Sequence, residues 1–262
     1  MECEEMGDVP PTHPRYASLM ARKLLTEAAS EGMLAESALI AHGRGEAFDY
    51  LLGERTCDAA RKAIGEVAAR LLSAERPIIS VNGNTVALAG PQVLACAAVL
   101  NCPVEVNIYY RTPERMKALL SALELQREEA IILYPELSQQ IAVVPILGAS
   151  PDGRIPNLDG PRANCHSDGI LGADVILVPL EDGDRCEALV EMGKTVCAVD
   201  LNPLSRTARK ATVTVVDELT RCLPLLLEDL IDGTLMPSEG WDNEQNLREV
   251  TSEMLRILDD AA

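Results

Sequence analysis

A chain of 262 residues, of which 47% are apolar, is long enough to bury a sizeable core and is not expected to be disordered. Its 41 acidic residues outnumber 23 basic ones, and the net charge of −18 would repel a polyanion, which argues against nucleic-acid binding. No apolar run reaches the ~18 residues that a membrane span needs, and the acidic start Met1–Glu5 is unlike a signal peptide, so we expect a cytoplasmic protein that binds no membrane.

The first third of the chain is predicted to be helical. Pro14 stands at the expected entry of a helix over 16–29, because proline is favoured in the first helical positions. A second helix is predicted over 57–74, where apolar residues recur with the spacing of one helical face.

The segment Leu39–Tyr50 combines an imidazole, a guanidinium, two glycines and two carboxylates. We expect a loop here, between helices at 24–32 and 46–52. Glycines on both sides of Arg44 would permit positive φ and close approach of a ligand, and the guanidinium could grip a phosphate or carboxylate through two hydrogen bonds. The alternative is a polar turn that binds nothing.

From residue 77 onward, short apolar segments alternate with helices, which predicts βαβ units and a parallel sheet covered on both faces. Strands are expected over 77–83, 104–110, 141–147, 173–180, 195–200 and 212–217, and helices over 91–100, 113–125, 186–192, 218–231 and 243–258. The segment 148–172 is predicted to be a long ordered loop with a functional role, since it carries Arg154, Arg162 and His166.

The predicted fold is α/β, with a Rossmann-like, mostly parallel sheet that has helices on both faces and is preceded by an N-terminal helical segment. The boundaries are a helical segment at 1–75, the Rossmann-like core at 76–235 and a C-terminal helix at 236–262, forming one compact domain overall.

Polar residues at the predicted strand ends are candidate ligand contacts, because open α/β sheets bind ligands beyond the carboxyl ends of their strands. They are Asn84, Asp182, Asp184, Arg185, Asp200, Asn202, Arg206 and Glu218. An acid there suits ribose and a nearby arginine suits phosphate. Asp182 and Asp184 are candidates to position Mg²⁺ on phosphate oxygens or, equally, to cap the helix that begins near Cys186. For the asparagines the alternative is a cap or turn role without a ligand.

The eight cysteines form no Cys-x-x-Cys pair and have no histidine at zinc spacing, so no metal ligand set is predicted. Cys96 and Cys197 lie in apolar runs and are expected to be small core residues, with all cysteines as free thiols in a reducing compartment. The chain also lacks a Walker loop and a G-x-G-x-x-G turn after a strand.

Six long motifs stand in a fixed order along the chain. They are Thr12-His-Pro-Arg-Tyr16, Leu39–Tyr50 with Gly53-Glu-Arg-Thr56, Ile79-Ser-Val-Asn-Gly-Asn84, Tyr110-Arg-Thr112, Val178–Arg185 and Val199–Arg206. Together they resemble the archaeal phosphopantothenate synthetase family, also called 4-phosphopantoate–β-alanine ligase. The resemblance covers about residues 12–225 and is lost over 126–150 and in the C-terminal tail.

The resemblance implies a ligase of coenzyme A biosynthesis that uses ATP and Mg²⁺ and forms a homodimer. The carboxylate of 4-phosphopantoate would attack the α-phosphate of ATP to give an acyl-adenylate and pyrophosphate, and β-alanine would then displace AMP. Two alternatives use the same arginines: a regulator that binds a nucleotide or phosphate without turnover, and an ATP-dependent kinase of a pantoate-like alcohol.

The resemblance also implies residue roles. The nucleotide contacts would be Arg22, Arg44, Asp200, Leu201, Asn202, Arg206, Thr207, Glu218 and Leu219. We assign catalytic roles to His42, Arg44 and Glu46, and substrate binding to Asn84, Arg111, Arg154, Asp182, Asp184 and Arg185. Two alternatives stay open: Arg22 as a solvated residue on a helix face, and His42 as a structural residue instead of a donor to the acyl oxygen.

Overall fold

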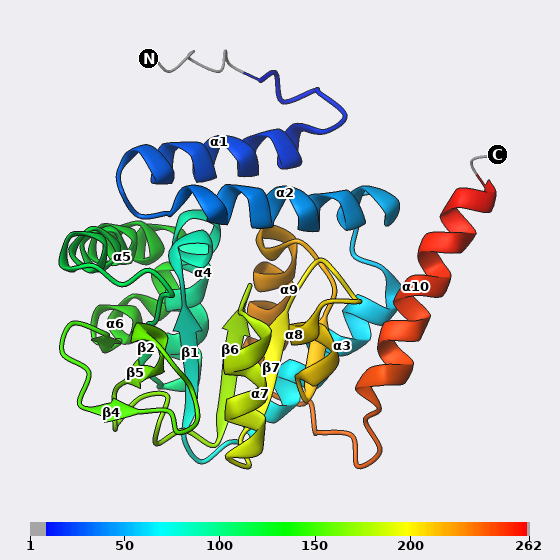
Figure 1. The fold of residues 1–262 in the computed structure, drawn as a ribbon. Helices are drawn as coiled ribbons and strands as arrows, with labels where there is room; N and C mark the ends of the chain where they lie inside the picture. The colour runs from blue at the N-terminus through cyan, green and yellow to red at the C-terminus, as the bar shows by residue number, and fades with distance from the viewer. Residues whose placement is uncertain (1–8, 261–262) are drawn as a thin grey trace.

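A six-stranded sheet lies at the centre of the protein, which a computed structural model describes over residues 9–260 (Figure 1). Its strands are β1 (Pro77–Val81), β2 (Val104–Val106), β3 (Ile146–Leu147), β6 (Val175–Pro179), β7 (Thr195–Val199) and β8 (Val213–Val215). All neighbours pair in parallel, in the order β3-β2-β1-β6-β7-β8. The strand order therefore reverses between β1 and β6, which confirms the predicted Rossmann-like sheet.

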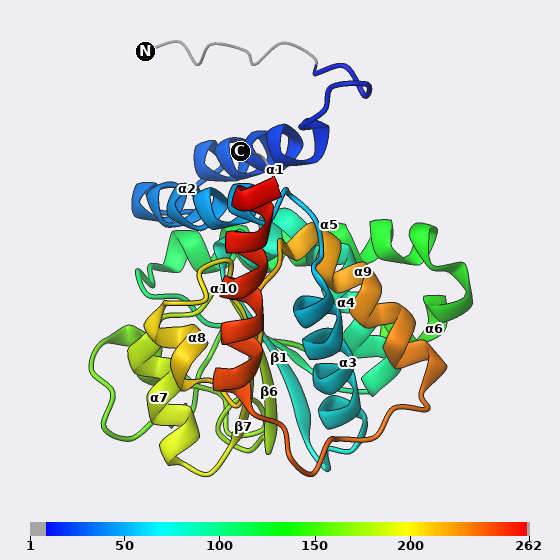
Figure 2. The same ribbon diagram turned by 90° about the vertical axis from the view of Figure 1, so that its right-hand side faces the viewer.

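Helices and a long loop cover the two faces of this sheet, as Figure 2 shows. The helices of one face are α3 (Asp58–Leu72), α4 (Gly83–Leu100) and α9 (Leu219–Asp232), and the opposite face carries α7 (Gly183–Glu191) with α8 (Arg206–Lys210) beside it. Because successive strand residues point to opposite faces, Ile79 packs in the larger core under α4, whereas Ile78 packs in the smaller core with α7 and the segment 155–173. Both faces are buried, as expected for a parallel sheet.

Among the described residues, α4 alone is long and apolar enough to cross a membrane, which corrects the expectation that no segment reaches this length, but 61% of it is buried inside the protein. It packs between α9 and α5 (Pro113–Leu133), which makes it a core helix. It begins earlier than predicted because Asn82 caps it, accepting the Thr85 N–H at 3.1 Å. A bend at Ala89 then accommodates Pro91 inside the helix.

The helices α1 (Tyr16–Ser30) and α2 (Glu36–Leu51) lie across the carboxyl ends of the strands (Figure 1). The predicted loop over 39–50 is wrong, since α2 runs through it without a break and neither glycine has a positive φ. Gly45 instead allows a close approach: a Cβ there would lie 3.2 Å from the Leu201 Cβ, whereas a Cβ at Gly43 would meet nothing within 4 Å.

The region 135–172 differs most from the prediction. The strand expected over 141–147 is wrong in its first part, where α6 (Ser138–Ala142) lies, and only β3 remains of it. Short apolar runs fit helix and strand equally well, which explains the error. The predicted long loop is confirmed apart from the small antiparallel pair β4 (Gly153–Arg154) and β5 (Asn164–Cys165).

The remaining elements agree with the prediction in type. The final helix, α10 (Asn243–Asp260), is confirmed, and the short α8 is an addition that the sequence did not indicate. Seven cysteines fall in the described part of the chain, and all of them are buried free thiols, as expected. The acidic start Met1–Glu5, with Cys3, lies outside the described residues.

Candidate functional site

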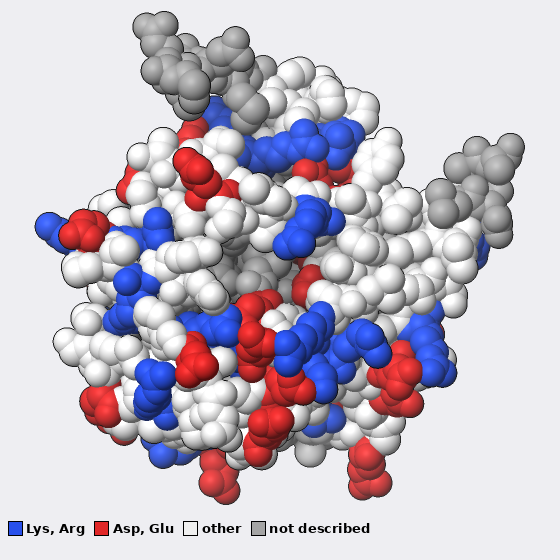
Figure 3. Space-filling view, in the orientation of Figure 1, with Lys and Arg blue, Asp and Glu red and all other residues white. Residues whose placement is uncertain are grey.

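A cavity of about 920 Å³ lies between α2 and the carboxyl ends of four strands. Figure 3 shows the hollow near the centre of this face, with acidic and basic side chains around it. Its floor is formed by the segments that follow β1, β2, β6 and β7: Asn82–Asn84, Asn107–Tyr110, Leu180–Gly183 and Asp200–Asn202. The cavity thus lies where the strand order reverses, the usual ligand site of such sheets. Its volume is at the upper end of ligand pockets, which span about 300–1,000 Å³.

About half of the site residues predicted from the sequence line this cavity. Nine predicted site residues line it: His42, Arg44, Asn84, Asp182, Asp200, Leu201, Asn202, Arg206 and Thr207. Eight others do not: Arg22, Glu46, Arg111, Arg154, Asp184, Arg185, Glu218 and Leu219.

Helix α2 supplies the wall opposite the strand ends, with His42 and Arg44. The Arg44 side chain is exposed to the cavity and has no carboxylate or hydrogen-bond partner among residues 9–260. The His42 Nδ1 is buried and likewise has no protein partner. Burial lowers the pKa of His42, so its imidazole is neutral at pH 7 and can act as a hydrogen-bond donor or acceptor toward a ligand.

Asp200, the residue that follows β7, lies in a tight turn. Asp200 accepts hydrogen bonds from the Asn202 N–H at 2.9 Å and from the Ser205 Oγ at 2.5 Å. Burial raises the pKa of Asp200. Asn202 in turn accepts the Leu204 N–H at 2.9 Å, so the turn role considered for it is present. The turn leads directly into α8, which Ser205 caps through the Ala208 N–H at 2.9 Å.

The backbone is strained where the strand order reverses. Leu180, which follows β6, has φ of +56°, a conformation that costs a side chain about 1–2 kcal/mol. The Asn82 amide, which follows β1, holds it by donating to the Leu180 carbonyl at 2.9 Å. Two helix N-termini therefore meet here, those of α4 and α7, and they provide a favourable place for negative charge.

The acids at the start of α7 are occupied by protein partners. Asp182 caps α7 by accepting the Arg185 N–H at 3.1 Å, so the capping role is observed. It also pairs with Arg162 at 2.7 Å, while Asp184 pairs with both Arg162 and Arg206.

The β2 end of the cavity contains Tyr109, Tyr110 and Arg115, which were not predicted as site residues, together with Arg162 from the loop that was predicted to be functional. Tyr109 and Tyr110 pack edge to face, with ring centroids 4.7 Å apart, and the Arg162 guanidinium lies 4.8 Å from the Tyr109 ring centre. Arg115, in the first turn of α5, donates to the Tyr110 carbonyl at 2.7 Å. The sequence pointed to this region through Arg162 of the loop 148–172 and through the motif at 110–112, where Thr112 caps α5 by accepting the Arg115 N–H at 3.2 Å.

Several predicted residues make structural contacts away from the cavity. Arg22 pairs with Glu46 between α1 and α2, its Nε lying 2.9 Å from Oε1. Arg154 donates to the Leu158 carbonyl inside its own loop, and Arg111 donates to the Gly148 carbonyl.

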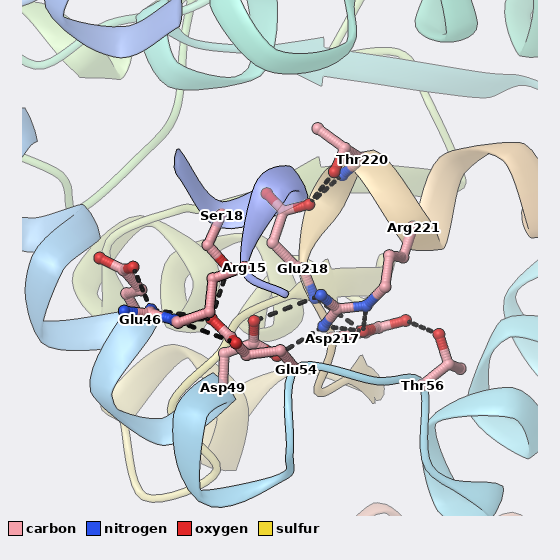
Figure 4. Close-up of polar contacts among 10 residues, drawn as sticks. All are labelled: Arg15, Ser18, Glu46, Asp49, Glu54, Thr56, Asp217, Glu218, Thr220 and Arg221. Atoms are coloured by element: carbon pink, nitrogen blue, oxygen red, sulfur yellow. Dashed lines mark hydrogen bonds and ion pairs between the residues drawn. The ribbon is translucent and has the colours of Figure 1, made fainter. Parts of the chain in front are cut away.

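Three others are built into the core around the sheet. Arg185 is buried completely and donates to the Ser80 Oγ at 3.1 Å and to Glu181. Leu219 is buried as well. Glu218 caps α9 by accepting the Thr220 N–H at 2.6 Å (Figure 4).

A buried ion pair fixes α2 over the cavity (Figure 4). Asp49 is the only residue of α2 that is fully buried, and its Oδ1 lies 2.5 Å from the Arg221 Nη2 of α9. The same guanidinium pairs with Asp217 at 2.7 Å, and Asp217 also accepts the Thr56 hydroxyl at 2.6 Å. This network at one end of α2 holds the helix that carries His42 and Arg44.

Comparison with known proteins gives one consistent family. The phosphopantothenate/pantothenate synthetase family model matches residues 59–256. The chain is 48% identical over 261 residues to a 4-phosphopantoate–beta-alanine ligase of Thermococcus kodakarensis, covering 97% of this chain and 94% of that protein. It is 45% identical over 260 residues to the enzyme of the same name from Methanosarcina mazei, covering 97% and 96%. The relative from Thermococcus onnurineus, also with that name, is 45% identical over 97% of this chain and 94% of its own length.

Proposed function

Because the chain belongs to the phosphopantothenate/pantothenate synthetase family, we propose that it is an ATP-dependent 4-phosphopantoate–β-alanine ligase of coenzyme A biosynthesis, acting in the cytoplasm. The match spans almost the full length of this chain and of its relatives. The observation that supports the proposal most directly is the large cavity at the strand-order reversal, with an arginine, Arg44, that no carboxylate among residues 9–260 neutralises.

The proposed reaction proceeds in two steps. A carboxylate oxygen of 4-phosphopantoate attacks the α-phosphorus of ATP, and pyrophosphate leaves with the electron pair of the broken P–O bond. The amine of β-alanine then attacks the acyl carbon, loses a proton, and expels AMP, which retains the oxygen of the original carboxylate. Catalysis rests on holding two anionic substrates and an amine against one another.

The nucleotide is assigned to the β7 end of the cavity. Asp200 and Asn202 follow a strand, where ribose and base edges are commonly bound, and Arg206 begins a helix beside them. Gly45 brings α2 against Leu201, so Arg44 reaches the same end from the opposite wall. Arg44 would hold ATP phosphates through its planar fork, and neutral His42 would donate to the developing charge near the acyl oxygen.

Magnesium would arrive on the ATP phosphates. No group of three or more His, Cys, Asp or Glu side chains among residues 9–260 could hold a metal by itself. This fits Mg²⁺, which binds through one or two carboxylates together with phosphate oxygens and water. Of the three carboxylates that line the cavity, Glu181, Asp182 and Asp200, the last two would assist, and the ion would offset the charge on the phosphates.

We further propose a homodimer, since α1 and α2 lie outside the sheet and its two covering layers. Light scattering at micromolar concentration should give twice the monomer mass of 28.2 kDa, and a monomer mass would contradict this part of the proposal.

The activity is tested by incubating the protein with ATP, Mg²⁺, 4-phosphopantoate and β-alanine and separating the nucleotides. A ligase that forms an acyl-adenylate yields AMP only when both organic substrates are present. Formation of ADP would favour a kinase instead, and no nucleotide consumption would favour a binding protein.

A further inference from the structure

The arginines that line the cavity differ in whether protein carboxylates neutralise them. Arg162 pairs with Asp182 at 2.7 Å, and Arg206 pairs with two acids of α7. In the described part of the chain, Arg44 and Arg115 have no carboxylate partner. Arg115 is half-buried, and a cation that is partly removed from water without a counter-ion is unfavourable, so its guanidinium favours an anion from outside the protein; Arg44 is exposed on the cavity wall, where it can pair with another anion.

The two uncompensated arginines lie at opposite ends of the cavity. Arg115 lies beside the segment that follows β2, whereas α2 near Arg44 touches Leu201, which follows β7. Strands β2 and β7 are separated by β1 and β6, which makes three strand spacings, or about 14 Å. One phosphate group cannot lie against both strand ends, so the arrangement favours two separate anions.

The surroundings of Arg115 prepare it for a phosphate. Its Nη1 donates to the Tyr110 carbonyl at 2.7 Å, which fixes the guanidinium, while its Nε is buried and has no partner within residues 9–260. It lies in the first turn of α5, a helix of 21 residues whose N-terminus favours negative charge. Tyr109 and Tyr110 enclose this end of the cavity with their rings.

We propose that Arg115 binds the phosphomonoester group of the acid substrate, and so makes the ligase select 4-phosphopantoate over pantoate. This assignment rests on the proposed function. It places the substrate phosphate at the β2 end and the nucleotide at the β7 end. The carboxylate and the α-phosphate then meet between them, beside the N-termini of α4 and α7, where the strand order reverses.

The test compares two acid substrates in two variants. In Arg115→Gln, kcat/KM for 4-phosphopantoate should fall roughly 10- to 150-fold, the loss of one hydrogen bond between charged groups. The kcat/KM for unphosphorylated pantoate and the KM for ATP should stay as in the wild type. For Arg115→Lys, which keeps the charge but not the planar fork, kcat/KM for 4-phosphopantoate should lie between the values for the wild type and for Arg115→Gln. Lys117→Gln removes an exposed positive charge from the same helix and should change neither substrate.

Equal losses for 4-phosphopantoate and pantoate, or no loss for either, would overturn the role of Arg115. If the proposed ligase function itself is wrong, the result can be distinguished from these, because the wild-type protein would then form no AMP with any acid. In that event, calorimetric binding of 4-phosphopantoate to the wild type and to Arg115→Gln still tests the site: equal affinities would overturn it, and weaker binding by the variant alone would support it.

Discussion

Replacing Arg221 by alanine should destabilise the protein where α2 is anchored, since this one guanidinium pairs with two buried carboxylates. Asp49 and Asp217 are each 1% exposed, and both pair with Arg221 within 2.7 Å. Without it, two negative charges would face each other in the protein interior, where the Thr56 hydroxyl and the Glu218 N–H, both donating to Asp217, are neutral partners and replace no positive charge. Breaking a buried ion pair on one side costs about 3–5 kcal/mol, and we expect a loss of this size in the free energy of unfolding at pH 8.

The loss should depend on pH in a defined direction. Burial, the largest influence, already raises the pKa of Asp49 above its ordinary value of 3.8, and Arg221 opposes this increase. Removing Arg221 raises the folded-state pKa further, so the folded variant binds a proton that the unfolded chain releases. Its stability is therefore greatest at low pH and falls as pH rises from about 4 through the raised pKa.

Urea denaturation at pH 5 and pH 8 measures both effects, with Arg248→Ala as the control. Arg248 pairs with Glu244 on α10 at 2.6 Å, but both side chains are more than two-thirds exposed, so its loss should cost less than about 1 kcal/mol at either pH. The reasoning fails if Arg221→Ala costs no more than this control, or if its cost is the same at pH 5 and pH 8.

Further predictions concern the cavity. Arg44→Lys should raise the KM for ATP about tenfold, since an ammonium cannot reproduce the planar fork; steady-state kinetics with unchanged KM would remove it from the phosphate site. Asp200→Asn should weaken ATP binding, measured by calorimetry, by roughly 1.5–3 kcal/mol while the fold persists. His42, whose pKa burial lowers, should titrate below pH 6.5 by NMR, and a midpoint above that value would contradict its buried position. Gly43→Ala should stabilise α2 by about 0.5–1 kcal/mol in thermal unfolding, and Gly45→Ala should gain less, because Leu201 must shift; equal gains would contradict the close approach.

The sheet was predictable because its strands carry strong local signals. The buried runs at 175–179 and 195–199 are short, apolar and bounded by turn residues, and the alternation with helices gave the parallel pairing. The rule that ligands bind at strand ends predicts Asp200 and Asn202 as ligand contacts, and both line the cavity.

Other features depend on tertiary contacts that no local pattern records. The two glycines of α2 indicated a loop, yet the helix persists, and Gly45 serves its packing against Leu201. Arg185 follows a strand end and was expected at the substrate, but as a helical residue of α7 it points into the core, where it reaches Ser80. Arg115 carries no motif, and its place in the cavity follows only from where the N-terminus of α5 meets the sheet.

The central claim is that the chain activates its acid substrate as an acyl-adenylate. The most direct measurement uses 4-phosphopantoate labelled with ¹⁸O in its carboxylate, with ATP, Mg²⁺ and β-alanine, followed by mass spectrometry of the phosphate-containing products. We predict that one ¹⁸O atom appears in AMP and none in pyrophosphate. Transfer of the label to orthophosphate, with formation of ADP, would show an acyl phosphate route and contradict the account.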